Sequence, residues 1–323
     1  MRIIILFLLL TIGACKSTEQ VIIDDMASDM TIAFGSCNHQ WDPQTIWSEV
    51  IQNDPDLWIW TGDIIYADTE DMVEMRKDYE HLKNTTGYRS LIQQCDIIGV
   101  WDDHDYGANN AGKEYAKKDS SKILLYDFLE VPKIHPSHNR PGVYQAYDYT
   151  FNDQDIKVIL LDVRSFQDKP TEPNASLLGA AQWSWLEDIL ANSTSDIHLI
   201  AGGIQFLHTE HIYEKWFNFP AEYNRLLDLL TNDDLKNIVL ISGDRHIGEI
   251  ASQELSNGTT IYEVTSSGLT HSYEKSTESN SLRIGPLIKT INFGIIRINN
   301  KTLDIELHDQ FNQIVSSHQM ILR

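Results

Sequence analysis

Trp58–Asp68 reads W-I-W-T-G-D-I-I-Y-A-D, an apolar run that ends in a glycine followed by an aspartate. The apolar part predicts a short buried strand, and Gly62 permits a sharp turn at its end. Asp63 then lies just past a strand's C-terminal end, where an α/β sheet usually places its chemistry. A carboxylate that bridges two ions, with Tyr66 and Asp68 facing the same crevice, indicates a binuclear metal site. The alternative is a strand followed by an ordinary polar turn.

Three more apolar runs lead directly into segments with several side chains that can bind a metal ion. Residues 31–34 precede G-S-C-N-H at 35–39, residues 97–100 precede W-D-D-H-D-Y-G at 101–107, and residues 237–241 precede S-G-D-R-H at 242–246. Loops at the carboxyl ends of strands converge in an α/β fold, so we expect these segments to form one site. Thiol, imidazole and carboxylate groups together indicate metal binding. A turn with a buried cysteine and a solvated acidic loop are the alternatives.

Two further strand ends carry single polar residues of interest. Residues 157–161 precede D-V-R, and Arg164 there is suited to clamp a phosphate because its planar fork matches the anion. The alternative is that Arg164 pairs structurally with one of the many carboxylates. Residues 197–201 precede G-G-I-Q, where Gln205 can offer a carbonyl oxygen to a hard cation or have its amide satisfied by backbone.

The loop after Gln205 contains two histidines, His208 and His211, and is rich in aromatic residues. Tyr213, Trp216, Phe217 and Phe219 predict a mobile loop that lines the rim of a pocket.

The order of the expected elements predicts an α/β fold. Strand 31–34, a helix from Asp42 to Ile51 and strand 58–62 imply a parallel pair with a right-handed crossover. Further helices are expected at 70–82, 119–129, 180–190 and 221–230, and strand 143–151 precedes the strand at 157–161. Beyond residue 248, segments 259–265, 291–298 and 301–308 should be mostly antiparallel strands.

Composition excludes several classes of protein. The chain has 323 residues, 42% of them hydrophobic, with 47 acidic against 25 basic residues and a net charge of −22. This charge argues against nucleic-acid binding, which needs a basic face, and suits a protein that binds cations. Three cysteines are too few for a disulfide framework; Cys37 and Cys95 could pair in an oxidising compartment, but each adjoins a candidate site segment.

The N-terminus predicts export and lipidation. Arg2 precedes an apolar run from Ile3 to Leu10, and I-G-A-C at 12–15 is typical of a lipoprotein signal. We expect residues 1–14 to be removed and Cys15 to carry a lipid, although an ordinary cleaved signal is the alternative. Residues 15–30 would then be a lipidated linker, which tethers the protein to a membrane on the extracytoplasmic side, in the periplasm or at the cell surface.

Taken together, these motifs resemble a known family. F-G-S-C-N at 34–38, W-T-G-D-I-I-Y-A-D at 60–68, W-D-D-H-D-Y-G at 101–107, L-D-V-R at 161–164 and S-G-D-R-H at 242–246 occur in the order of the PhoD-like (alkaline phosphatase D) branch of the calcineurin-like metallophosphatases. The resemblance covers roughly residues 31–250. It implies that residues 31–323 form a four-layer αββα sandwich, in which helices flank two central mixed sheets.

The resemblance also implies an alkaline phosphomonoesterase that uses a metal-activated water. By similarity, Fe(III) would be held by Cys37, Asp63, Tyr66 and His246, and a second ion, Ca²⁺, by Asp63, Asp103 and Asp244. His104 would protonate the leaving oxygen or hold the phosphate, Arg164 would bind it, and Asn38 and Arg245 would also contact a small phosphate-ester substrate. The protein is expected to be a monomer.

Two departures from the family and two rival functions remain. The N-terminal β-sandwich of some secreted members is not expected here, and the N-terminus has a single arginine instead of a twin-arginine signal. A phosphodiesterase or phospholipase on the same site is the nearest rival function. A surface binding lipoprotein with a degenerate site is the rival from a different class.

Overall fold

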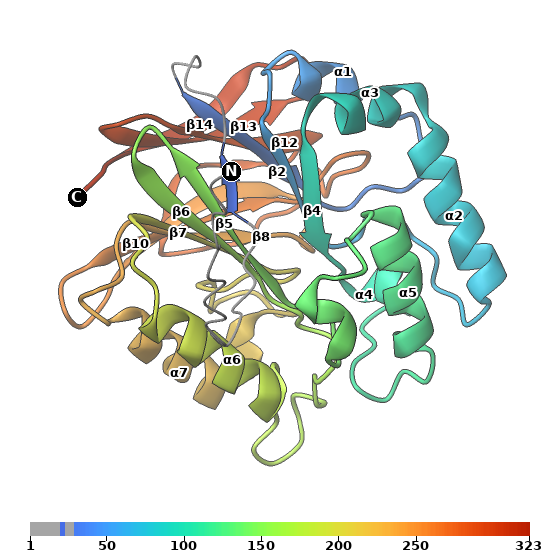
Figure 1. The fold of residues 1–323 in the computed structure, drawn as a ribbon, viewed down its shortest axis with the longest axis horizontal. Helices are drawn as coiled ribbons and strands as arrows, with labels where there is room; N and C mark the ends of the chain where they lie inside the picture. Colours follow the sequence, from blue (N-terminus) through green and yellow to red (C-terminus); the bar gives the residue numbers. More distant parts are fainter. Residues whose placement is uncertain (1–19, 23–28) are drawn as a thin grey trace, which may run out of the picture.

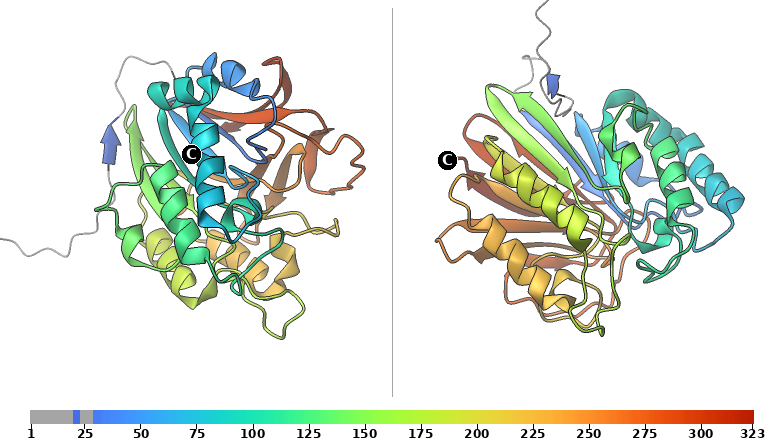
Figure 2. Two further views of the ribbon diagram at one scale, coloured as in Figure 1. Left: turned by 90° about the vertical axis from the view of Figure 1, so that its right-hand side faces the viewer. Right: turned by 60° about the horizontal axis from the view of Figure 1, so that its bottom comes forward.

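Two mixed β-sheets lie at the centre of this computed structural model, which describes residues 20–22 and 29–323. Helices cover the outer faces of both sheets, and the layers are clearest in Figure 2. The predicted four-layer α/β sandwich is therefore confirmed.

The six-stranded sheet contains the strands that lead to the first three candidate loops. Its order is β14 (Ile314–Ile321), β13 (Thr302–Asp309), β12 (Asn292–Ile298), β2 (Met30–Gly35), β3 (Leu57–Thr61) and β4 (Asp96–Val100). Strands β2, β3 and β4 run parallel, so their carboxyl ends lie at one edge of the sheet. The C-terminal strands β12, β13 and β14 extend it antiparallel, as expected for this part of the chain.

The eight-stranded sheet contains the remaining strands. Its order is β1 (Gln20–Ile22), β5 (Gln145–Phe151), β6 (Gln154–Leu160), β7 (Ile197–Ala201), β8 (Ile238–Ser242), β10 (Thr260–Ser266), β9 (Gly248–Glu254) and β11 (Arg283–Ile288). Strands β6, β7, β8 and β10 are parallel to one another. Gln20–Ile22, predicted as part of a linker, instead pairs with the edge strand β5, whose backbone groups would otherwise lack a partner strand on that side.

Helices pack against the two sheets in separate groups (Figure 1). The first group is α1 (Ile46–Ile51), α2 (Met72–Asn84), α3 (Thr86–Gln94), the short α4 (Asp103–Tyr106) and α5 (Lys118–Phe128), on the side of the six-stranded sheet. The second is α6 (Gly179–Ala191) and α7 (Pro220–Leu230), which pack on the eight-stranded sheet and form a second apolar core with it. Two 3₁₀ turns, η1 (Pro136–Asn139) and η2 (Trp216–Asn218), lie in connecting loops.

Two helical predictions differ from the structure. The helix expected from Asp42 begins at Ile46, because residues 39–42 form a turn in which Asp42 N–H donates to His39 O at 3.0 Å. Helix α3 was not predicted, since Gly87 in its first turn lowers helix propensity. The same glycine lets α3 approach α1, because a Cβ at Gly87 would lie 2.8 Å from Trp47 Cβ.

A cluster of tryptophans holds the strand that ends at Asp63. Trp58 and Trp60 lie on one face of β3, and each meets Trp47 of α1 edge to face, with ring centroids 5.2 and 5.5 Å apart. Trp60 Nε1 also donates to the hydroxyl of Tyr88 in α3 at 3.0 Å. All four rings are buried, so β3 is fixed by aromatic packing as well as by its neighbouring strands.

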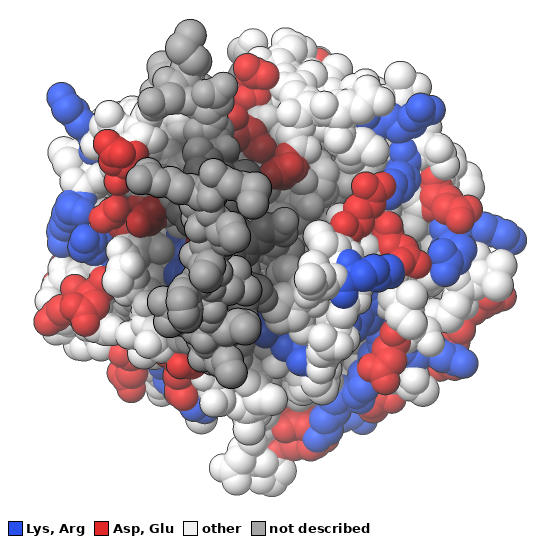
Figure 3. All heavy atoms as spheres, in the orientation of Figure 1, with Lys and Arg blue, Asp and Glu red and all other residues white. Residues whose placement is uncertain are grey.

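The predicted signal peptide and Cys15 lie outside the described residues. In residues 20–22 and 29–323, no helix has the length and apolar character needed to cross a membrane. Cys37 and Cys95 are both free thiols, so they do not pair with each other. On the described part of the face in Figure 3, acidic and basic side chains are interspersed.

Candidate metal centre

The strand ends of both sheets meet at the candidate centre. A Cβ on Gly243, which follows β8, would lie 2.4 Å from Ser36 Oγ and 2.5 Å from Thr61 O, at the ends of β2 and β3. Gly62 has φ +86°, and a Cβ there would lie 2.4 Å from the Cβ of Asp102, just past β4. Only glycine allows these approaches, so the glycine turns seen in the sequence bring the loops together.

Several predicted ligands have a left-handed backbone conformation. The φ angles are +58° at Cys37, +49° at Asp63, +67° at Asp244 and +54° at His246. Residues other than glycine rarely adopt this region, and each instance costs on the order of 1–3 kcal/mol. Such conformations persist where the surrounding structure enforces them, and they cluster at functional sites.

Asp63 lies between a thiol and a phenol. Its Oδ2 accepts hydrogen bonds from Cys37 Sγ and from the Tyr66 hydroxyl, each at 3.3 Å. Burial raises the pKa of Cys37 to about 11, and burial together with Cys37 and Asp103 raises the pKa of Asp63 well above its usual value. Without a cation these groups therefore hold protons that a metal ion would displace.

A second set of carboxylates adjoins the first. Oxygens of Asp102, Asp103 and Asp244 lie within 4.8 Å of one another, and so do ligand atoms of Asp63, Asp103 and His104. Burial, followed by repulsion from Asp103, raises the pKa of Asp244 to about 7. Asp103 is the partner whose pKa is lowered: burial opposes this, but Arg164 and His104 outweigh it.

These residues fit two metal ions. Buried carboxylates of like charge are stable together only with protons or cations between them. The group around Asp63 offers sulfur and phenolic oxygen as ligands, whereas the group around Asp103 and Asp244 offers carboxylate oxygens. Burial and then His271 lower the pKa of His246 to about 3, so its neutral imidazole has a lone pair available. The donors therefore divide into a softer and a harder set that share Asp63.

His104 has an acidic partner that the sequence pattern did not identify. Its Nδ1 lies 2.9 and 2.8 Å from the two carboxylate oxygens of Asp68, and its ring packs 4.1 Å from that of Tyr66. Burial opposes protonation of His104, but Asp68 and Asp103 outweigh it and raise its pKa. The spacing of Asp68 after Asp63 indicated a shared crevice but not this pair.

His271 is a second residue of the centre that the sequence pattern did not identify. It lies between β10 and β11 with its ring 4.5 Å from that of His246 and 5.2 Å from that of Tyr66. No motif surrounds it in the sequence, so only the three-dimensional contact reveals it.

Arg164 pairs with carboxylates, and its Nη2 has no hydrogen-bond partner among the described residues. Its side chain is fully buried; Nε donates to Asp102 Oδ1 at 2.5 Å and Nη1 to Glu214 Oε2 at 2.9 Å. Its Nη2 lies 3.9 Å from Asp103 Oδ1. The structure therefore supports the alternative, in which Arg164 pairs with carboxylates and compensates buried negative charge.

Gln205 does not offer its oxygen to a metal ion. Its Oε1 accepts a hydrogen bond from His211 Nε2 at 2.9 Å, and its Nε2 donates to Glu249 at 2.7 Å and Thr265 at 2.9 Å. Both ends of the amide are occupied, so the prediction of Gln205 as a ligand is corrected. The amide is satisfied by side chains, not by the backbone as first considered.

The two remaining predicted substrate contacts lie beside the centre. Asn38 is buried; its Nδ2 donates to Ile64 O at 3.0 Å, and its Oδ1 has no hydrogen-bond partner within the described chain. Arg245 pairs with Glu278, and its Nη1 lies 3.8 Å from Asp244 Oδ2. Contact between these residues and a substrate stays a prediction.

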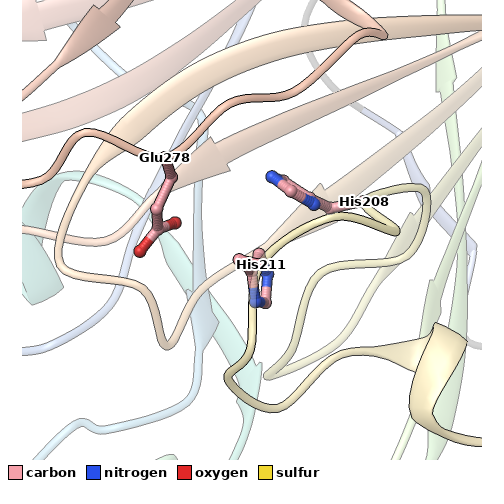
Figure 4. Close-up of side chains that lie close together, drawn as sticks. All are labelled: His208, His211 and Glu278. Carbon is pink, nitrogen blue, oxygen red and sulfur yellow. The ribbon is translucent and has the colours of Figure 1, made fainter.

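His208, His211 and Glu278 form a separate group whose potential ligand atoms lie within 4.8 Å of one another (Figure 4). Nδ1 of His208 accepts the Glu210 N–H at 3.0 Å, and Nδ1 of His211 accepts the Tyr213 N–H at 3.1 Å. Neutral histidines bonded in this way carry their proton on Nε2, so they have no free lone pair for an ion. We interpret this group as a hydrogen-bonded support for its loop.

Two mixed sheets with flanking helices, and buried metal-binding side chains where their strand ends meet, define a calcineurin-like metallophosphatase fold. The chain belongs to the PhoD-like phosphatase family, whose family model matches residues 32–302.

Known relatives agree with this assignment. Alkaline phosphatase D of Bacillus subtilis (strain 168) is 23% identical over 268 residues, and the match covers 67% of this chain and 46% of that protein. The chain thus spans about half the length of this curated relative, at 46%. The solved structure of PhoD matches with a TM-score of 0.72 at 16% identity, over 91% of this chain and 69% of that one. GAP50, the anchor in the inner membrane complex of Plasmodium, matches with a TM-score of 0.65 at 13% identity, over 92% of this chain and 90% of that one. At these identities the structural matches establish the fold alone.

Replacing Arg164 should lower the stability of the fold more than it weakens substrate binding. Arg164→Leu leaves Asp102 buried without its cation, and we expect the unfolding free energy to fall by about 3–5 kcal/mol. Arg225→Leu, which removes an exposed pair with Glu187, should cost less than about 1 kcal/mol. Urea denaturation of both variants measures the difference. Unchanged stability combined with weaker phosphate binding would restore the clamp interpretation.

Metal-free protein should show a pH dependence that originates at Asp244. The folded-state pKa of about 7 lies above the ordinary value of 3.8, so the folded state binds this proton more tightly. The contribution of Asp244 to stability is therefore lost as pH rises from about 4 through 7. In chelator-treated samples, wild type should lose stability relative to Asp244→Asn over this range. A constant difference between the two proteins across this pH range would contradict the assignment.

Proposed function

We propose that this chain is a metal-dependent phosphoric ester hydrolase that acts as a phosphomonoesterase on small phosphate esters. The observation that carries the proposal is the position of Asp63, whose carboxylate adjoins both the Cys37–Tyr66 pair and the Asp103 group. Membership of the PhoD-like phosphatase family supports the same activity.

We further propose Fe(III) for the softer donor set and Ca²⁺ for the harder one. Cys37, Asp63, Tyr66 and His246 would hold the first ion, and Asp63, Asp103 and Asp244 the second. When bound, such a pair of ions supplies Lewis acidity toward the phosphoryl oxygens and an activated water. Thiolate and phenolate ligands suit a trivalent transition metal, whereas carboxylates alone suit calcium.

His104 is suited to donate a proton to the leaving oxygen. Asp68 holds its Nδ1–H, which fixes the tautomer and orients the ring so that the second proton of the imidazolium is on Nε2. The ring packs against Tyr66, and its side chain is 16% exposed. His104 is therefore held in one orientation while solvent and a ligand can still reach it, as a general acid requires.

We also propose that the protein is tethered to the outer side of a membrane through a lipid on Cys15. The lipoprotein-type signal at residues 12–15 supports this proposal. Labelling with a palmitate analogue tests it: Cys15→Ala should abolish incorporation, and persistent labelling would contradict it.

Metal content and turnover test the centre together. Elemental analysis of protein that begins after Cys15 should find about one iron and one calcium ion per chain. Cys37→Ala should lose the iron and reduce turnover of p-nitrophenyl phosphate by roughly 100-fold or more. Cys95→Ala is the matched control, because its thiol is half-buried and bonds only to Leu91 O among the described residues.

The outcomes of this experiment separate the alternatives. Zinc or manganese in place of iron would keep the phosphatase and overturn the iron assignment. Protein that binds no metal and hydrolyses neither a monoester nor a diester would contradict the proposed enzyme.

Asp68→Asn should weaken proton donation by His104. Leaving groups that need a proton, such as the alkoxide of an alkyl phosphate, should lose roughly 10- to 100-fold in kcat, and nitrophenolate clearly less. Glu70→Gln, a nearby exposed carboxylate, is the control and should leave both rates unchanged. Equal losses for both leaving groups would indicate that Asp68 acts on structure or metal binding instead of on the proton.

A further inference from the structure

The aromatic loop at residues 205–219 is tightly anchored beside the candidate centre. Its Glu214 receives two hydrogen bonds from Arg164 Nη1, at 3.1 and 2.9 Å, and one from Gln167 Nε2 at 3.1 Å. Its Glu210 accepts hydrogen bonds from Ser281 N and Ser279 Oγ, both at 2.7 Å, across the gap to the loop before β11. These contacts do not fit the mobile loop predicted from the sequence.

Hydrogen bonds from within this loop hold the backbone of Tyr213 on both sides. Its N–H donates to His211 Nδ1 at 3.1 Å, and its carbonyl accepts from Lys215 Nζ and Asn218 Nδ2, both at 3.2 Å. Lys215 is almost fully buried, so this support lies inside the loop. The Tyr213 side chain is nevertheless 40% exposed.

Arg245 connects this ring to the centre. Its guanidinium carbon lies 3.8 Å from the centroid of the Tyr213 ring, and its Nη1 lies 3.8 Å from Asp244 Oδ2. Tyr213 is thus one side chain away from a predicted metal ligand.

Two acidic side chains near the ring are already paired with arginines. Glu214 pairs with Arg164, and Glu278 pairs with Arg245. Ile212, next to Tyr213, is 89% exposed. What this surface offers a ligand is therefore an apolar, aromatic face, to which a flat uncharged ring is complementary.

We propose that Tyr213 is a specificity-determining residue that stacks on an uncharged aromatic ring in the leaving group of the phosphate ester, either an aryl group or a nucleobase. This inference rests on the proposed function, since the phosphoryl group must bind at the centre for its leaving group to reach the ring. Because the backbone on both sides of Tyr213 is fixed before any ligand binds, little ordering entropy opposes the stacking.

The test compares three monoesters: p-nitrophenyl phosphate, adenosine 5′-monophosphate and glycerol phosphate. In Tyr213→Leu, KM for a ring-bearing ester should rise roughly tenfold with kcat little changed, since base stacking on aromatic side chains has about this strength. KM for glycerol phosphate should not change. Tyr213→Phe keeps the ring and should behave like wild type.

Phe217→Leu is the matched control. Phe217 lies in the same loop with the same 40% exposure, but its ring packs against Tyr223 and not against Arg245. It should leave the KM of all three esters unchanged. An effect on p-nitrophenyl phosphate alone would identify an aryl ligand, and an effect on the nucleotide alone would identify a nucleobase.

Two results would overturn the inference: equal changes in KM for all three esters, or no change in Tyr213→Leu. If no ester is hydrolysed, the proposed function fails, and calorimetric binding of adenosine and p-nitrophenol then tests the ring platform separately. Binding that wild type shows and Tyr213→Leu loses would support it. Absence of binding to wild type would overturn it.

Discussion

The repulsion between buried carboxylates is the interaction on which the rest of this structure depends. Asp63, Asp102, Asp103 and Asp244 lie together at strand ends of both sheets. The first three are almost completely shielded from water, and the side chain of Asp244 is 17% exposed. The parallel strands of the two sheets and their glycine turns place these carboxylates close together. The tryptophans that pack on β3 hold that strand in position. Burial and mutual repulsion raise the pKa of Asp63 and Asp244. Protons or cations must therefore compensate the negative charge of this cluster.

Arg164 supplies part of this compensating positive charge from within the protein. Its full burial and its bonds to Asp102 and Glu214 make it a permanent internal cation, unlike an arginine that is unpaired until a substrate binds. A fixed cation can compensate only the carboxylates that it reaches, which are Asp102 and, more weakly, Asp103. Asp63 is left to protons or to metal ions, whereas Asp244 also has Arg245 Nη1 at 3.8 Å. The same arginine holds Glu214 in the aromatic loop, so charge compensation and loop position depend on one side chain.

The sequence predicted the part of the site that depends on chain order. Apolar runs lead to Asp63, Asp103 and Asp244, with a turn glycine before Asp63 and Asp244, and the carboxyl ends of parallel strands bring such loops together. The sequence could not predict the direction in which a side chain at a strand end points. Arg164 and Gln205 follow strands just as the metal-binding candidates do, yet both turn inward to protein partners. Asp68 and His271 join the site through contacts that no spacing rule describes.

The two loops beside Asp244 link the centre to the surface through paired contacts. Arg245 lies between Asp244 and the Tyr213 ring, and its other partner, Glu278, belongs to the loop before β11. Glu210 joins the same two loops at a second point. A displacement of Arg245 would therefore disturb both loops as well as the carboxylate at Asp244. Selectivity for the leaving group and retention of the second ion should for this reason respond together to changes at Arg245, whereas changes confined to the exposed face of Tyr213 should affect selectivity alone.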